Sequence, residues 1–219
     1  HLSSIINNPV MKQGFISIQD EAQGLICHLL SPKPSERIVD LCSAPGSKTT
    51  YMAELMRNQG MIFAVEVSSA RMKLVIENIV RLAISIVRAV LADGRNYSIE
   101  GVDKVLIDAP CSNSGVIAKR PEVKDRVNSK VIRRLARLQY DLLSNAGKFL
   151  CVGGSLVYST CSILPQENEE VVEAFLADHS NFVVEPARDF TPVGNEYIKV
   201  LPGEFHTDGV FAARLKRVA

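Results

Sequence analysis

Residues 37–48, RIVDLCSAPGSK, contain the turn from which the rest of the fold can be traced. A short apolar strand is expected over 37–41, and a helix is expected from Lys48 to Arg57, ahead of an Asn-Gln-Gly stop. The turn between them holds Gly46 next to a helix N-terminus, where backbone N–H groups can meet a carboxylate or a phosphate. Because the turn lacks GxGxxG spacing, it is by itself a weak signal for a nucleotide.

Strands and helices alternate on both sides of this turn. Upstream, 18–30 predicts a helix that ends before the turn-rich 31–35, and the alternation closes downstream with a strand at 210–215. This order is typical of a parallel, doubly wound α/β sheet with right-handed crossovers. The other strands are expected at 61–65, within 85–91, at 104–107 and at 155–158, and the other helices at 69–82, 129–150 and 165–177.

Composition limits the class of protein. The chain has 219 residues, of which 47% are hydrophobic, so we expect one domain over 1–219, with 1–30 as an N-terminal lead-in. Its 25 basic and 24 acidic residues give a net charge of +1, so a nucleic-acid surface has to be a local patch. No apolar run approaches the roughly 18 residues of a membrane span, and no leader pattern is evident. We therefore expect a cytoplasmic monomer.

Acidic residues follow three of the predicted strands, where the ligand crevice of an open α/β sheet lies. Glu66 comes one β-α-β unit after Gly46, a spacing at which a carboxylate can accept both hydroxyls of a ribose. Asp93 follows the next strand and is expected near an adenine edge, and Asp108 follows the strand after that. Glu66 or Asp93 alone is explained as well by helix capping or solvation, but the three matched positions together favour a ligand site.

The five cysteines are odd in number and include no CxxC pair, which fits neither a disulfide framework nor a zinc site, so no metal is expected. Cys27 and Cys151 are interpreted as small core residues, Cys151 leading into a Gly153-Gly154 turn. The remaining three, Cys42, Cys111 and Cys161, lie at the carboxyl ends of strands.

Cys111 and Cys161 are flanked by small or rigid residues that leave each sulfur open to a substrate. A thiol is strongly nucleophilic only when ionised, so the site needs a nearby positive charge, which Lys48 can supply. Placement alone does not decide which of the two cysteines attacks.

One basic stretch, 119–137, follows Cys111 and could hold a phosphate backbone beside the chemistry. A solvated helix face would produce the same pattern. The candidate RNA-binding residues are Lys119, Arg120, Lys124, Arg126, Arg133, Arg134 and Arg137, with Lys130 as a further cation and Glu122 and Asp125 as the acids between them.

Three motifs together resemble the RsmB/Nop2/Sun family of RNA cytosine-5 methyltransferases. The similarity runs from about residue 19 to the end of the chain, and two cysteine motifs in this order after a glycine turn are highly specific. At 43–48 SAPGSK stands where AAPGGK is usual, and at 112–115 SNSG stands where SGTG is usual. The motifs are Asp40-Leu-Cys-Ser-Ala-Pro-Gly-Ser-Lys-Thr49, Asp108-Ala-Pro-Cys111 and Ser159-Thr-Cys161-Ser162, followed by Glu167-Asn168-Glu169.

The resemblance implies a Rossmann-like class I methyltransferase fold, with a doubly wound, mostly parallel sheet of seven strands, an antiparallel C-terminal strand, and S-adenosylmethionine over the strand ends. It also implies that Cys161 is the nucleophile, that Cys111 assists product release, and that Asp108 lies near the methyl-transfer centre. The cofactor-binding residues it implies are Cys42, Ser43, Ala44, Pro45, Gly46, Ser47, Lys48, Glu66, Arg71, Asp93 and Asp108.

The implied chemistry explains these residue types. Thiolate addition at carbon 6 of cytosine makes carbon 5 able to take a methyl group, and the base has to be unpaired or flipped out, which favours tRNA or rRNA. No RNA-targeting domain is expected in the chain. The alternatives are a DNA cytosine-5 methyltransferase with the Cys of Pro110-Cys111 as nucleophile, a catalytically silent RNA-binding or assembly factor, and a metabolite methyltransferase.

Overall fold

A computed structural model describes residues 8–117, 119–123 and 127–219 of the chain. Its strands are β1 (Arg37–Leu41), β2 (Met61–Glu66), β3 (Val87–Leu91), β4 (Val102–Asp108), β5 (Leu150–Thr160), β6 (Phe182–Glu185), β7 (Ile198–Val200) and β8 (Val210–Arg217). Over the described ranges they form one eight-stranded sheet in the order β3-β2-β1-β4-β5-β8-β6, with β7 also paired to β8.

The first five strands are parallel, and β8 is antiparallel to β5, β6 and β7. This confirms the doubly wound α/β fold with an antiparallel C-terminal strand. The sheet has one strand more than the seven expected, counted over the described residues, because the two short strands β6 and β7 both pair with β8. Strands this short carry little periodic signal in a sequence.

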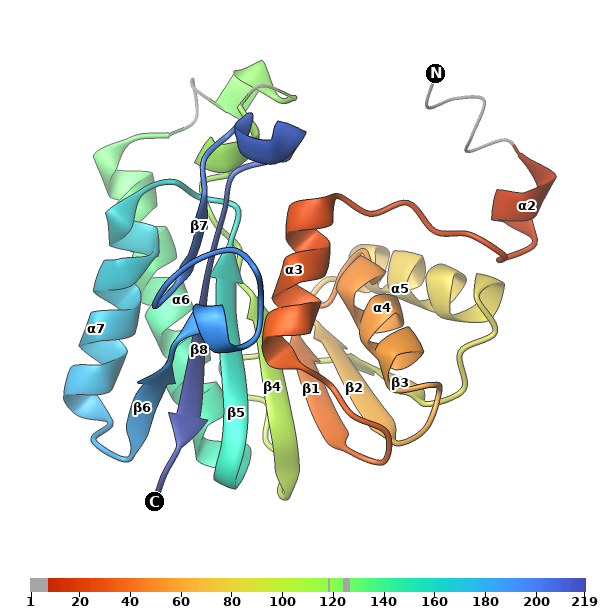
Figure 1. Cartoon of the computed structure of the whole chain (residues 1–219), viewed down its shortest axis with the longest axis horizontal. Helices are drawn as coiled ribbons and strands as arrows, with labels where there is room; N and C mark the ends of the chain where they lie inside the picture. Colours follow the sequence, from red (N-terminus) through yellow and green to blue (C-terminus); the bar gives the residue numbers. More distant parts are fainter. Residues whose placement is uncertain (1–7, 118, 124–126) are drawn as a thin grey trace.

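Helices cover both faces of the sheet (Figure 1), so the fold has three layers. On one face lie α3, α4 and α5, and on the other lie α6 and α7. No helix within the described residues is long and apolar enough to cross a membrane. The α-helices are α2 (Pro9–Lys12), α3 (Glu21–Leu30), α4 (Ser47–Leu55), α5 (Ser69–Arg81), α6 (Ser129–Phe149) and α7 (Glu169–Asp178), and the 3-10 turns are η1 (Ser114–Val116), η2 (Pro121–Val123), η3 (Pro165–Glu167), η4 (Ala187–Asp189) and η5 (Glu204–His206).

The alternation of side chains along β1 shows how the two cores are divided. Ile38 is fully buried with the helices of the α3 face, whereas Val39 and Leu41 are fully buried with those of the α6 face. Successive residues of a strand point to opposite faces, and a parallel strand covered on both sides is therefore apolar throughout. Each fully buried side chain of this kind contributes about 1.5–3 kcal/mol relative to exposure.

The second half of the N-terminal lead-in belongs to this core. Asp20 caps α3 by accepting a hydrogen bond from the Ala22 backbone N–H at 3.1 Å. At the other end of α3, the guanidinium of Arg214 on β8 donates to the carbonyl oxygens of Leu29 and Leu30 at 2.7 and 2.8 Å. These two bonds satisfy carbonyl groups that a helix C-terminus leaves unpaired.

The prediction for Cys151 was wrong, whereas Cys27 is fully buried as predicted. Gly153-Gly154 is not a turn after the core but part of β5, beside a register shift between Val102 and Lys104 of β4. A Cβ at Gly154 would lie 2.8 Å from the Asp103 carbonyl oxygen, so the strands approach too closely there for any other residue. Cys151 precedes this irregularity and is exposed.

Candidate active site

The pairing of β4 with β5 brings the two cysteine motifs together. Asp108 and Ser159 are register partners at the carboxyl ends of these strands, and the hydroxyl of Ser159 donates to the Asp108 carboxylate at 3.2 Å. The loops that follow place the sulfur atoms of Cys111 and Cys161 at 3.0 Å from each other. Both cysteines are half-buried. The thiols therefore form a pair at one point of the sheet edge.

The two thiols have different surroundings. The Cys161 thiol lies 2.8 Å from Oδ1 of Asn113, a residue that no sequence signal assigned to the site. Asn113 has a φ of +60°, and asparagine tolerates this left-handed region better than most side chains do. The hydrogen bond to Cys161 and then burial raise the pKa of Cys111 well above its usual value. Cys111 accordingly retains its proton at neutral pH.

Lys48 is placed differently from the sequence hypothesis. Its ammonium group is buried and donates to the Asp108 carboxylate at 2.6 Å. Burial lowers the pKa of Lys48, but the charge and hydrogen bond of Asp108 together raise it, so Lys48 is cationic. In the described part of the chain, Lys48 makes no ion pair or hydrogen bond through its ammonium group to Cys111 or Cys161. Its charge is paired with Asp108.

The Cys111 loop packs closely against the segment that leads into β8. The Gly115 backbone N–H donates to the Cys161 carbonyl oxygen, and the Gly209 N–H donates to the Gly115 carbonyl oxygen, both at 2.9 Å. A Cβ on Gly115 would lie 2.6 Å from the Gly209 oxygen. Lys119 adds ion pairs to Asp20 at 3.1 Å and Asp208 at 2.8 Å. Four segments are therefore joined around the thiol pair.

A cavity of about 520 Å³ lies beyond the ends of β1, β2 and β3. Four predicted cofactor residues line it, namely Cys42, Glu66, Arg71 and Asp93. Glu66 is 2% exposed, and its Oε1 accepts from the Ser68 backbone N–H at 2.9 Å. Hydrogen bonds from the Arg95 side chain lower the pKa of Asp93, which is therefore ionised.

The turn residues 43–48, which the resemblance assigns to the cofactor, do not line this cavity. Gly46 caps α4 with a φ of +102°, and a Cβ there would lie 3.2 Å from Val75 Cα. Glycine is therefore required at that position. The carbonyl oxygens of Ala44 and Pro45 accept hydrogen bonds from the Arg71 and Asn78 side chains at 2.7 and 3.0 Å.

One wall of the cavity comes from α6, for which the sequence predicts an apolar stripe and a basic stretch but no cofactor contact. Arg134 and Arg137, predicted as RNA-binding residues, line it together with Leu138 and Leu142. Arg137 also pairs with Asp141, one helical turn away, at 3.0 Å. The apolar positions of α6 therefore close the cavity.

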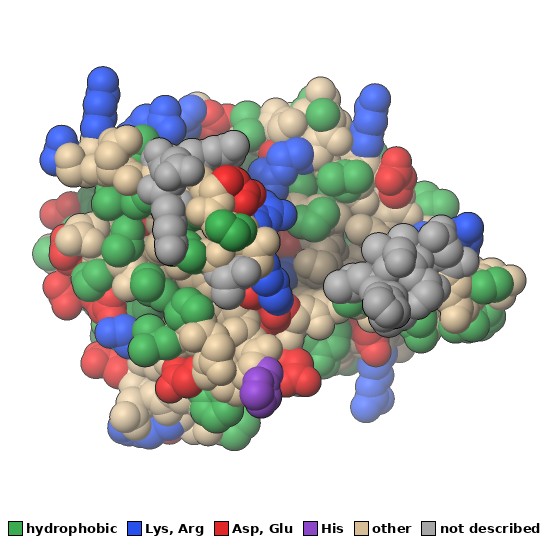
Figure 2. All heavy atoms as spheres, turned by 90° about the horizontal axis from the view of Figure 1, so that it is seen from above, with side chains coloured by type: hydrophobic (Ala, Val, Ile, Leu, Met, Phe, Trp, Pro, Cys, Tyr) green, Lys and Arg blue, Asp and Glu red, His purple; other side chains and the backbone are tan. Residues whose placement is uncertain are grey.

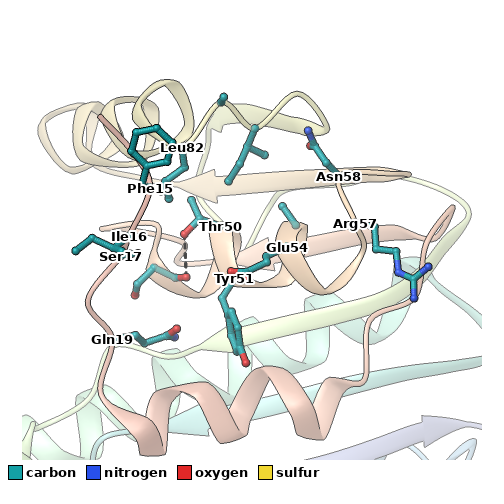
Figure 3. Close-up of a pocket in the computed structure, with 15 residues that line it drawn as sticks. Phe15, Ile16, Ser17, Gln19, Thr50, Tyr51, Glu54, Arg57, Asn58 and Leu82 are labelled. Carbon is teal, nitrogen blue, oxygen red and sulfur yellow. Dashed lines mark hydrogen bonds between the residues drawn. The ribbon is translucent and has the colours of Figure 1, made fainter. Parts of the chain in front are cut away.

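A second cavity, of about 700 Å³, is not at this edge (Figure 3). It lies between residues 14–19 and α4, where Phe15 and Gln19 face Thr50 and Tyr51. Within the described residues, Ser47 is the one predicted cofactor residue that lines it, and neither thiol does. Its size therefore does not identify it as the reaction site.

The predicted basic stretch is only partly described. Lys124 and Arg126 lie outside the described residues, Lys119 is paired with acids, and Arg120 and Arg133 are exposed. Viewed onto the end of the sheet where η1 lies, basic and acidic side chains are interspersed around a central hollow (Figure 2). A single positive surface is not visible in that view.

This strand order, with a reversed strand beside β5 and a ligand cavity past β1 to β3, defines a class I methyltransferase fold. The chain belongs to the RsmB/F family, because the family model described as 16S rRNA methyltransferase RsmB/F matches residues 27–216. The resemblance found in the sequence motifs is thereby confirmed. The methyl donor of this family is S-adenosylmethionine.

Individual relatives agree. The probable ribosomal RNA small subunit methyltransferase B of Bacillus subtilis is 34% identical over 98% of this chain and 50% of its own. The 28S rRNA (cytosine(4447)-C(5))-methyltransferase of Homo sapiens is 37% identical over 95% of this chain and 28% of its own. The structure of NSun6 from Pyrococcus horikoshii with SFG has a TM-score of 0.88 at 32% identity, covering 98% and 56% of the two chains. The chain thus spans half or less of the two ribosomal RNA methyltransferases and slightly more than half of the NSun6 chain.

The residues around the smaller cavity fit S-adenosylmethionine. Glu66 Oε2 and Ser43 Oγ are buried, and within the described residues neither has a hydrogen-bond partner. Arg71 Nη1 is 3.4 Å from Glu66 Oε2, an ion-pair contact without hydrogen-bond geometry. Buried polar atoms are nearly always paired, and Glu66 lines the cavity, so its Oε2 is available to a ligand bound there. Asp93 and Leu142 line the same cavity as Glu66.

Proposed function

We propose that this chain is the catalytic domain of an S-adenosylmethionine-dependent RNA (cytosine-5) methyltransferase that acts on ribosomal or transfer RNA. The observation that supports it most directly is the thiol pair, 3.0 Å apart, at the sheet edge that also holds Asp108 and the cofactor cavity. The names of the relatives favour ribosomal RNA. Five free cysteines, one a nucleophile, suit the reducing cytoplasm, where we place the protein as a monomer.

In this mechanism Cys161 passes its thiol proton to solvent and adds as the thiolate to carbon 6 of an unpaired or flipped cytosine. Asp108, oriented by Lys48 and Ser159, hydrogen-bonds the ring nitrogen or amino group of the base. When bound, S-adenosylmethionine supplies the methyl group that carbon 5 takes. Loss of the carbon 5 proton to solvent then allows the sulfur of Cys161 to leave, and the thiol of Cys111, whose sulfur lies 3.0 Å from that of Cys161, is the candidate to assist this departure. Exposed Arg120 and Arg133 are candidates for RNA backbone contacts.

The direct test uses the purified protein with methyl-labelled S-adenosylmethionine, total RNA and, in parallel, DNA, followed by mapping of the modified cytosines. Label in 5-methylcytosine of RNA is expected. Label in DNA alone would favour the DNA enzyme, and cofactor binding without transfer to either would favour a silent assembly factor.

The assignment of the two thiols has its own test. Cys111→Ser is expected to accumulate a denaturant-resistant protein–RNA adduct, because addition by Cys161 continues while release is impaired. The adduct is measured as a gel-shifted band that ribonuclease removes. Complete loss of the adduct in this variant would identify Cys111 as the nucleophile instead.

A further inference from the structure

Glu167, at the end of η3, is a fully buried carboxylate that links the two cysteine loops. Its Oε1 accepts from the Ser112 backbone N–H at 2.8 Å, and its Oε2 accepts from the Ser162 hydroxyl at 2.7 Å. Ser112 directly follows Cys111, and Ser162 directly follows Cys161. One side chain is thus bonded to the residue after each thiol.

A third bond extends the link to α6. The amide of Gln139 donates to Glu167 Oε1 at 3.1 Å and to the carbonyl oxygen of Pro110, the residue before Cys111, at 2.9 Å. Within the described residues, Glu167 forms no ion pair with a cation. Burial of an ionised carboxylate without such a pair is costly unless hydrogen bonds compensate, so the three donors are what hold the charge there.

Neighbouring groups keep this arrangement from relaxing. The Tyr158 hydroxyl donates to the Glu167 carbonyl oxygen, and the Asn168 amide donates to the Ser162 carbonyl oxygen at 2.9 Å. Ser162 Oγ also lies 3.0 Å from Ser114 Oγ. Glu167 is therefore held by hydrogen bonds at both its backbone and its side chain.

We propose that Glu167 is a positioning residue that fixes the two cysteine loops relative to each other through its hydrogen bonds to the residue after each thiol, so that Cys161 is the thiol that attacks. The naming of Cys161 as attacker rests on the proposed function, whereas the fixing of the two cysteine loops by Glu167 does not. Besides the neighbouring thiol, the titratable groups that face Cys111 are Glu167 and Tyr158. The charge of Glu167 adds to the rise in the pKa of Cys111 that Cys161 and burial cause.

The test compares Glu167→Gln, which keeps the shape and removes the charge, with Glu167→Asp, which keeps the charge on a shorter side chain. Glu170→Gln, an exposed site on α7, is the matched control. Iodoacetamide modification of Cys111 and Cys161 is followed against pH by mass spectrometry on the protein without RNA. Unchanged S-adenosylmethionine binding serves as the check on folding.

For Glu167→Gln, the pH at which Cys111 becomes reactive is expected to fall by no more than about one unit, which makes Cys111 at most roughly tenfold more reactive near neutral pH. Glu167→Asp is expected to keep the wild-type midpoint for Cys111 but to lower kcat with little change in KM, because the loops move apart. Glu170→Gln is expected to match the wild type in both respects.

The proposal is overturned if Glu167→Gln binds the cofactor and shows the wild-type pH profile at both cysteines. It is equally overturned if Glu167→Asp shifts the pH profile of Cys111 alkylation as far as Glu167→Gln does. A third contradicting result is that Glu167→Gln fails to fold while Glu167→Asp retains the wild-type kcat. Because alkylation requires no RNA, failure of this inference is separate from failure of the wild type to methylate RNA.

Discussion

The two halves of the site edge differ in how their buried polar groups are paired. Around the thiols, the Glu167 carboxylate and the nearby serine hydroxyls are hydrogen-bonded to one another. Within the described residues, Gln139 Oε1 is the one buried atom of that network without a partner. Around the cofactor cavity, Ser43 Oγ and Glu66 Oε2 have no hydrogen-bond partner there. The thiol half is organised by hydrogen bonds within the protein, whereas the cofactor half keeps two buried oxygens without a partner in the described residues.

The largest effect is expected at the thiol half. Cys161→Ala should reduce methyl transfer by at least about a thousandfold, because covalent addition is lost. Its affinity for S-adenosylmethionine, measured by calorimetry, should remain within a factor of about two. Cys151→Ala, at an exposed cysteine on β5, the strand that precedes Cys161, is the control. Wild-type methyl transfer by Cys161→Ala would contradict the role of Cys161 as nucleophile. A large loss of S-adenosylmethionine affinity would contradict the separation of the two halves.

The converse change is at the cofactor half. Glu66→Gln retains an acceptor for the Ser68 N–H but removes the charged acceptor for a ribose hydroxyl. A charged hydrogen bond contributes about 1.5–3 kcal/mol, so the cofactor Kd should rise about ten- to a hundredfold. The reactivity of the two thiols should not change. An unchanged Kd, equal to that of Glu77→Gln on the surface of α5, would exclude Glu66 as a cofactor contact.

The third prediction concerns pH. Asp40 lies beneath the cofactor turn and accepts a hydrogen bond from Thr49, and burial raises its pKa from 3.8 to about 7. Its folded pKa exceeds the unfolded one, so the stability that it contributes is complete below about pH 3.8 and is lost as the pH rises through about 7. Asp40→Asn should remove this loss and be more stable than the wild type at pH 8, on the order of a few kcal/mol.

Urea denaturation from pH 4 to pH 8 measures this difference. Asp189→Asn, at an exposed site, should leave the pH dependence as in the wild type. If the stability gap between Asp40→Asn and the wild type does not widen with pH, then Asp40 is not the buried proton acceptor.

The smallest effect is expected at the edge of the thiol half. Lys119→Met removes two ion pairs from a side chain that is 61% exposed, and such surface pairs contribute about 0–1 kcal/mol. The unfolding free energy should fall by no more than that, and the difference should shrink in high salt. Lys73→Met, on the surface of α5, is the control. If Lys119→Met loses more unfolding free energy than this control and the loss persists in high salt, then Lys119 fixes the Cys111 loop by more than charge.

The sequence predicted those parts of the fold and site that depend on local patterns. β1 was placed at its observed bounds, and the acids and cysteines at strand ends followed from where parallel sheets bind ligands. The sequence does not predict β6 and β7, because these short strands are defined by their pairing with β8 and not by a local pattern. Cys151 was misplaced because a glycine pair signals a turn and a strand irregularity equally well.

Contacts distant in the chain were beyond such patterns. The role of Leu138 and Arg134 in the cavity wall depends on how α6 lies across the sheet, and its periodicity indicated only an apolar stripe. Lys48 was assigned to a thiol because its partner Asp108 is 60 residues away. Glu167 was recognised as part of a motif, but its partner Ser112 is 55 residues away.

The contact between Gly115 and Gly209 has a consequence for redesign of this protein. Since neither position has room for a Cβ, the segment before β8 acts as a template against which the Cys111 loop is shaped. Libraries that vary the loop to alter the choice of substrate should hold both glycines constant and sample neighbouring positions such as Val116. In evolutionary terms, the two positions are expected to change together or not at all.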